Sequence, residues 1–181
     1  CDWSSDVCSS DLSLLRLLHG LTATLAAVAW FTGLLLLLGF DGRWGRLPFN
    51  LDGEWIELHA ANGVLLTLLV VLFTAYAVTL GAGRLRRVGN SVPLLALALA
   101  VGSGSQMQAE WMLDQRALPL VYAVHITAWF VLALAVPLHL ITSLRRGGWP
   151  LLTSMLRLQI RPLDGPTDWP SQVVRYLRRG R

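Results

Sequence analysis

The hydrophobic residues of this chain gather into four long runs that are separated by short polar segments. The runs lie at about 14–40, 55–80, 92–107 and 118–144. A helix needs about 20 predominantly apolar residues to cross a bilayer, and all but the third run reach that length. The third run is short and rich in small residues, as in a tilted or protein-covered helix. The pattern predicts an all-α integral membrane protein with a four-helix transmembrane bundle.

The composition supports a membrane location. Hydrophobic residues make up 54% of the chain and charged residues 14%, whereas a soluble domain has about 25% charged residues. The net charge of +4 is positive enough for a nucleic-acid-binding protein. However, the arginines flank the apolar runs and form no patch with interleaved aromatic residues. We therefore expect membrane lipid, and no nucleic acid, as the partner of this surface.

The distribution of arginines predicts the orientation of the helices. The loop after the second run and the C-terminal tail hold most of the arginines, and the other two loops mix arginines with acidic residues. By the positive-inside rule, the middle loop and both termini face the cytoplasm of a multi-pass protein.

The chain divides into three segments. Residues 1–12, CDWSSDVCSSDL, contain both cysteines and resemble a translated sequencing adapter, so we expect a non-native segment and a different true start. Residues 13–146 form the transmembrane domain. Residues 147–181 form a basic cytoplasmic tail, in which 149–160 is a candidate for an amphipathic helix on the membrane interface.

All four histidines lie inside the apolar runs, where ionisable groups are costly and usually functional. His125 and His139 share the fourth run and are fourteen residues apart, which is about 21 Å of helix rise and nearly four whole turns. In the predicted orientation, His19 and His139 lie near the cytoplasmic side. His59 and His125 lie near the periplasmic side. The sequence therefore predicts two pairs at matching depths.

Two neutral imidazoles facing each other are what a six-coordinate haem iron requires. We therefore expect the histidines to be the axial ligands of two haems b that carry electrons across the membrane. Glycines could leave room for the macrocycles, although close helix packing explains them equally well. Arginines could pair with haem propionates, although each one alone is explained as a topology anchor. The candidate glycines are Gly33 and Gly63. The candidate arginines are Arg16, Arg84, Arg145 and Arg146 on the cytoplasmic side, with Arg43, Arg46 and Arg116 as the periplasmic counterparts.

The motifs RLLHG, ELHAANG and H-x13-H lie in the first, second and fourth runs, and the third run has no histidine. This arrangement resembles the bacterial di-haem b-type cytochromes, which include the cytochrome b561 family and the membrane subunits of formate dehydrogenase and nickel–iron hydrogenase. The resemblance covers roughly 14–146. It implies the same pairs, His19 with His139 and His59 with His125.

The resemblance also implies partners and a location. A quinone is a candidate ligand, and a redox partner protein or dehydrogenase subunit a candidate partner; a homodimer is a candidate assembly. The location implied is the bacterial inner membrane. The loop DGRWGRLP is similar to that of cyanobacterial cytochrome b-domain proteins. This similarity makes the thylakoid membrane a second candidate location.

Several alternatives stay open. A histidine-based metal or proton transporter would usually carry a carboxylate deep in a span, and none is evident. The sequence has no nucleotide-binding glycine motif, no iron–sulfur cysteine run and no catalytic triad. We therefore expect an electron-transfer component of an oxidoreductase. Whether it is a stand-alone quinone oxidoreductase or a subunit of a larger complex is left open.

Overall fold

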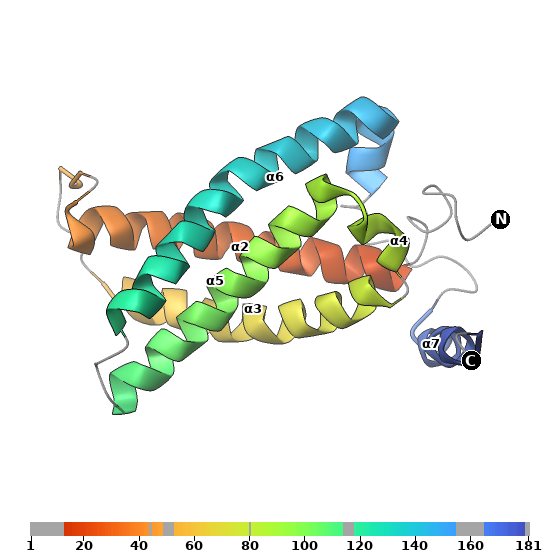
Figure 1. Cartoon of the computed structure of the whole chain (residues 1–181), viewed down its shortest axis with the longest axis horizontal. Coiled ribbons are helices and arrows are strands. Elements are labelled where there is room, and N and C mark those ends of the chain that lie inside the picture. Colours follow the sequence, from red (N-terminus) through yellow and green to blue (C-terminus); the bar gives the residue numbers. More distant parts are fainter. Residues whose placement is uncertain are drawn as a thin grey trace. The chain divides into compact units, whose positions relative to one another are not determined.

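The computed structural model describes most of the chain, and every regular element in that part is a helix (Figure 1). The described residues are 13–43, 45–48, 53–79, 81–113, 118–154 and 165–179. The expected non-native segment, 1–12, lies outside them. The helices are α2 (Ser13–Leu36), η1 (Leu37–Asp41), α3 (Trp55–Val78), α4 (Ala82–Leu85), α5 (Val88–Leu113), α6 (Leu118–Ser154) and α7 (Trp169–Arg179).

Four stretches of helix are long and apolar enough to cross a membrane, which confirms the all-α architecture with four candidate spans. They are Ser13–Asp41, Trp55–Val78, Val88–Gln108 and Pro119–Ser154. Their outward faces carry large apolar side chains, for example Phe31, which would be unfavourable in water. These features indicate a multi-pass membrane protein.

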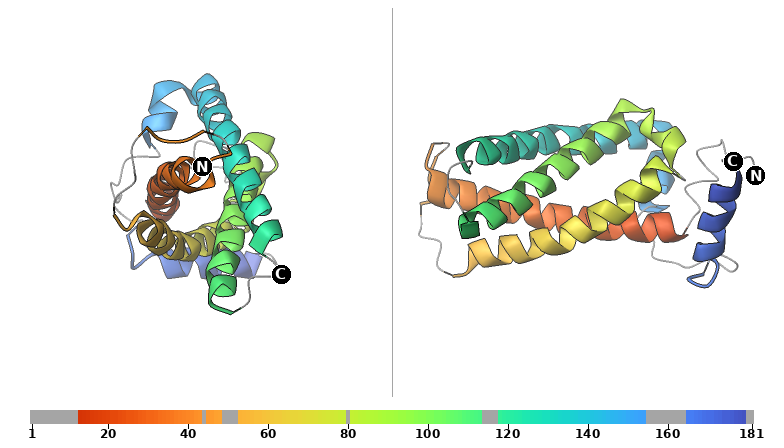
Figure 2. Two further views of the ribbon diagram at one scale, coloured as in Figure 1. Left: turned by 90° about the vertical axis from the view of Figure 1, so that its left-hand side faces the viewer. Right: turned by 60° about the horizontal axis from the view of Figure 1, so that its bottom comes forward.

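Helix α5 is longer than the run 92–107 that the sequence predicts, since it begins at Val88 and ends at Leu113. Pro93 lies near its start, where a missing backbone N–H is tolerated better than in the middle of a helix. Gly102 and Gly104 lie inside the helix and do not end it. Helix α5 is drawn as one continuous ribbon, from yellow-green to green, in Figure 2.

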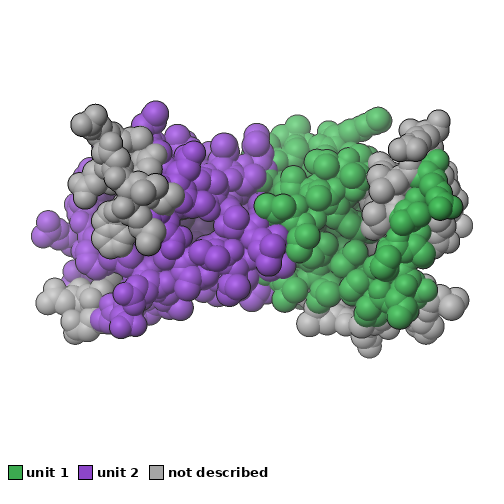
Figure 3. All heavy atoms as spheres, turned by 90° about the horizontal axis from the view of Figure 1, so that it is seen from below, with its two compact units in different colours: residues 1–21, 71–94, 133–181 green, residues 22–70, 95–132 purple. Residues whose placement is uncertain are grey.

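The chain folds into two compact units (Figure 3). Each long helix contributes one part to each unit. Unit 1 comprises Cys1–Leu21, Val71–Leu94 and Ala133–Arg181, and unit 2 comprises Thr22–Val70 and Leu95–Leu132. His19 and His139 fall in unit 1, whereas His59 and His125 fall in unit 2. Each predicted histidine pair is therefore contained in a single unit.

The core of unit 2 contains side chains from all four long helices. Leu66 of α3 is 1% exposed and forms the centre together with Val70 and Leu97. Six further residues pack around this centre, and half of them are alanines, whose small side chains let helices approach closely. They are Leu25, Ala26, Ala29, Ala98, Val101 and Leu132.

Gly148 interrupts α6 inside the fourth candidate span, Pro119–Ser154. It has φ 62° and ψ −166° inside α6, so the helix is broken there into two pieces. This break lies close to the predicted boundary between 13–146 and 147–181. Of the predicted interfacial helix at 149–160, the part up to Ser154 is helical and 155–160 lies outside the described residues.

The tail also contains α7, which we did not predict from the sequence. The backbone N–H of Gln172 donates to the carbonyl of Asp168 at 3.1 Å, which closes the first turn of this helix. Pro170 lies in that turn, where its missing N–H costs nothing.

Replacing Leu66 by Ala should lower the free energy of unfolding by about 2 kcal/mol or more, because the cavity cannot be filled by lipid. Leu68→Ala is the matched control, since Leu68 is 62% exposed on the same helix and should lose less than about 1 kcal/mol. Unfolding by sodium dodecyl sulfate, followed by circular dichroism, measures both. Equal losses would contradict the packing described for unit 2.

Candidate functional site

The structure brings the four histidines together in the two pairs that the sequence predicts. In unit 1, the ring centroids of His19 and His139 are 6.4 Å apart and the ring planes make an angle of 38°. In unit 2, the centroids of His59 and His125 are 6.2 Å apart, with an angle of 89°. In each unit, the second histidine comes from α6.

Both separations suit two imidazoles on opposite sides of one metal ion. A bond from a metal to an imidazole nitrogen is about 2.0–2.1 Å long. The coordinating nitrogen lies about 1 Å from the centroid of its own ring. Two imidazoles bound in line on opposite sides of one metal therefore have centroids roughly 6 Å apart. The measured separations of 6.4 and 6.2 Å agree with that value.

Backbone carbonyls of α5 fix the tautomer of both α6 histidines. Nδ1 of His139 lies 2.9 Å from the carbonyl oxygen of Gly89, and Nδ1 of His125 lies 2.9 Å from that of Ala100. A carbonyl oxygen can only accept a hydrogen bond, so each Nδ1 must carry the proton. Each Nε2 then keeps its lone pair, which is the form of imidazole that binds a metal.

Two features of α5 expose these carbonyls. A helix carbonyl normally accepts from the residue four positions later, and for Gly89 that residue is Pro93, which has no N–H. The Gly89 carbonyl is therefore open to His139. The carbonyl of Ala100 is accessible to the ring of His125 because Gly104 has no side chain. A Cβ at Gly104 would lie 3.2 Å from Cε1 of His125. No role for Pro93 was predicted from the sequence, although a proline four residues after a glycine in a span is a signal that the sequence offers.

His59 obtains its partner from a side chain. Oγ1 of Thr32 lies 2.7 Å from Nδ1 of His59 and 2.8 Å from the carbonyl oxygen of Val28. The single hydroxyl proton of Thr32 is directed to a carbonyl, so its lone pair accepts from Nδ1 of His59. Three histidines thus have Nε2 free as a donor to a metal. Nδ1 of His19 is buried with no hydrogen-bond partner in the described part of the chain.

The two predicted glycines differ in their surroundings. A Cβ at Gly33 would lie 3.3 Å from Cε1 of His59 and 3.6 Å from Cδ1 of Trp129. Gly33 therefore makes room for the histidine ring itself and for an indole. A Cβ at Gly63 would have no described atom within 4 Å, so Gly63 faces open space next to the same helix turn as His59.

The predicted arginines also differ. Arg16 is 4% exposed and lies one turn before His19, and its Nη2 donates to Oγ of Ser13 at 3.4 Å. Arg145 is exposed at the end of the apolar part of α6, six residues beyond His139. Arg84 of α4 is near enough to His19 for an electrostatic interaction. Arg16 and Arg84 are therefore the cations beside the unit 1 pair.

A stacked indole pair lies next to the histidines of unit 2. The rings of Trp30 and Trp129 are 4.8 Å apart and nearly parallel, and Nε1 of Trp129 donates to the carbonyl of Trp30 at 3.1 Å. This contact joins α2 to α6 and forms one wall of the space at Gly33. This contact could not be predicted from the sequence, because Trp30 and Trp129 are far apart in the chain.

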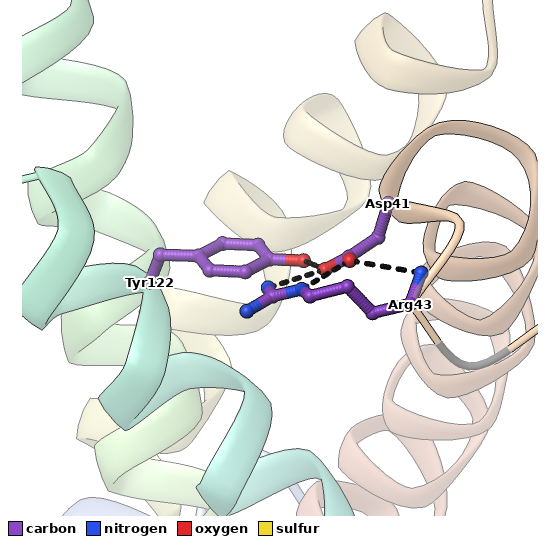
Figure 4. Close-up of polar contacts among 3 residues, drawn as sticks. All are labelled: Asp41, Arg43 and Tyr122. Carbon is purple, nitrogen blue, oxygen red and sulfur yellow. Dashed lines mark hydrogen bonds and ion pairs between the residues drawn. The ribbon is translucent and has the colours of Figure 1, made fainter.

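A polar cluster connects η1 to the start of α6 (Figure 4). The carboxylate of Asp41 accepts hydrogen bonds from the hydroxyl of Tyr122 and from the guanidinium of Arg43. The carboxylate raises the pKa of Arg43 above its usual value, so this guanidinium stays charged. Because Tyr122 precedes His125 by three residues, the cluster fixes the helix turn that carries His125.

No family model, curated protein or solved structure matches this chain. Among the described residues, no group of three or more His, Cys, Asp or Glu side chains comes together as a metal site.

Replacing Gly104 by Ala tests the close approach of α5 to His125. An Ala in place of Gly inside a helix normally adds about 0.5–1 kcal/mol of stability. Gly102→Ala should show this gain, since a Cβ there meets no described atom within 4 Å. Gly104→Ala should not show it, because the ring of His125 would have to move. Thermal unfolding measures both, and equal gains would contradict the contact.

Proposed function

We propose that the two histidine pairs hold two haems b and that the chain is a transmembrane electron carrier. The observation that carries this proposal is the geometry of the pairs. In each unit, two imidazoles lie at the separation that one iron requires, and in three of the four rings the proton on Nδ1 leaves Nε2 as the metal donor.

A pair of imidazoles suits haem better than it suits a metal ion held by side chains alone. Structural zinc sites use four protein ligands, and catalytic sites ordinarily use three. A porphyrin supplies four nitrogens in one plane, so its iron needs only two donors from the protein. Haem would supply the one-electron chemistry. Held by a histidine from each of two helices, such a site would transfer electrons and would leave no open position for oxygen.

Several residues of this chain support the proposed sites in other ways. Arg16 and Arg84 lie beside His19 and are suited to pairing with the propionates in unit 1. The exposed position of Arg145 makes it the less suitable of the predicted cations. A Cβ at Gly63 would have no described atom within 4 Å, so Gly63 leaves space beside His59.

The rest of the proposal concerns orientation and partners. The arginine distribution supports cytoplasmic termini. The bacterial inner membrane, or the thylakoid membrane in a cyanobacterium, is the location that the resemblance implies. Electrons would pass between a quinone pool and a redox partner, which is either a separate protein or a dehydrogenase subunit. Pro137 lies inside α6 two residues before His139, and it frees a carbonyl that could bind a quinone near unit 1.

The proposal predicts a reduced-minus-oxidised spectrum with a b-type α-band and two haems per chain in the pyridine haemochrome assay. His125→Ala should remove the unit 2 haem and His139→Ala the unit 1 haem, because each deletes one of two axial ligands. Leu140→Ala is the matched control, since Leu140 is exposed beside His139, and it should keep both haems.

A folded protein that stays colourless when it is produced with ample haem would contradict the proposal. Stoichiometric zinc or copper in that colourless protein would instead support the transporter alternative. Co-purification of a larger subunit from native membranes would distinguish a subunit from a stand-alone oxidoreductase.

A further inference from the structure

The hydrogen bond to His59 differs from those to the other histidines because its acceptor is a side chain that substitution can remove. His139 is held by a backbone carbonyl. His125 has two acceptors, the carbonyl of Ala100 at 2.9 Å and Oγ of Ser103 at 3.2 Å. His59 has Oγ1 of Thr32 at 2.7 Å.

The position of Thr32 is well defined by its surroundings. Its side chain is buried, with 5% of the residue exposed. Its hydroxyl lies 2.8 Å from the carbonyl of Val28 and 3.2 Å from that of Ala29, one turn earlier in α2. These bonds direct the hydroxyl proton along the helix and turn a lone pair towards Nδ1 of His59. Gly33, the next residue, admits the ring of His59 at this point of α2.

We propose that Thr32 is a positioning residue that lowers the reduction potential of the unit 2 site. This inference rests on the proposed function, because the potential belongs to a haem ligated by His59. An acceptor on Nδ1 increases the electron density that Nε2 donates to the iron. Stronger donation stabilises the ferric state, which carries the higher charge. The same hydrogen bond fixes the tautomer and the orientation of the ring.

Thr32→Val removes the acceptor and keeps the shape of the side chain. In a redox titration of the purified protein, one of the two midpoints should rise and the other should stay unchanged. If the loss of the hydrogen bond shifts the equilibrium between ferric and ferrous haem about tenfold towards the ferrous form, the midpoint potential rises by about 59 mV, since one electron is transferred. Thr32→Ser retains the hydroxyl and should restore the original midpoint. The low-spin ferric signal of one haem should change in electron paramagnetic resonance for Val only.

Ser103→Ala is the matched control, because Ser103 also lies against a histidine Nδ1 in unit 2. Its removal leaves the carbonyl of Ala100 as an acceptor for His125. We therefore expect a smaller shift than for Thr32→Val. If Thr32→Val yields no haem-loaded protein, Thr32→Ala, which also lacks the hydroxyl, replaces it in the same titration.

Unchanged midpoints in Thr32→Val or Thr32→Ala would overturn the inference, provided that the unsubstituted protein shows two haem transitions. A shift that Thr32→Ser fails to reverse, or one that Ser103→Ala reproduces in full, would also overturn it, because either result would assign the shift to packing. Absence of haem transitions from the unsubstituted protein would contradict the proposed function itself and is distinguishable from these outcomes.

Discussion

The arrangement of this protein depends on where the Nδ1 protons of its histidines go. An imidazole inside an apolar span can offer Nε2 to a metal only if Nδ1 carries the proton, and an acceptor on Nδ1 stabilises this tautomer because water is scarce there. For His125 and His139 the acceptor is a backbone carbonyl of α5, and for His59 it is Thr32 of α2. The helices that provide the acceptors thus determine what the histidines can do.

Helix α5 is the clearest example, because it contains no histidine and yet orients two. Gly89 and Ala100 are eleven residues apart on α5, which is close to three turns, so their carbonyls lie on one side of the helix. Pro93 has no N–H to donate to the carbonyl of Gly89, and Gly104 lets the ring of His125 approach the carbonyl of Ala100. Pro93 and Gly104, which weaken a helix when taken alone, are thus the residues that let α5 contact the histidines of α6.

The sequence was sufficient to predict the four apolar helices and which histidines come together. Apolar runs of membrane length predict the spans. The pairing follows from depth: His125 and His139 lie about 21 Å apart along one helix, and in the predicted orientation each shares its depth with one histidine of another span. The acceptors of Nδ1 could not be predicted in this way. Thr32 and His59 are joined by a contact between helices, and nothing in the spacing of either helix specifies which threonine will face which ring.

The extent of α5 and the existence of α7 were also beyond the sequence analysis. A run defined by hydropathy ended where polar residues begin, although a helix can continue through polar residues to Leu113. Helix α7 contains few apolar residues and is short, so a search for long apolar runs passes over it. The polar cluster of Asp41, Arg43 and Tyr122 was missed for the same reason as Thr32, because its members come from η1, the following turn and α6.

The two sites differ in ways that bear on the direction of electron transfer under the proposed function. Unit 1 places the cations Arg16 and Arg84 beside His19, and nearby positive charge favours an added electron. In unit 2, the charge of Arg43 is balanced by Asp41, and both histidines have acceptors on Nδ1, which favour the ferric state. Both differences favour the electron on the unit 1 site. In the orientation that the arginines predict, that direction leads from the periplasmic side to the cytoplasmic side.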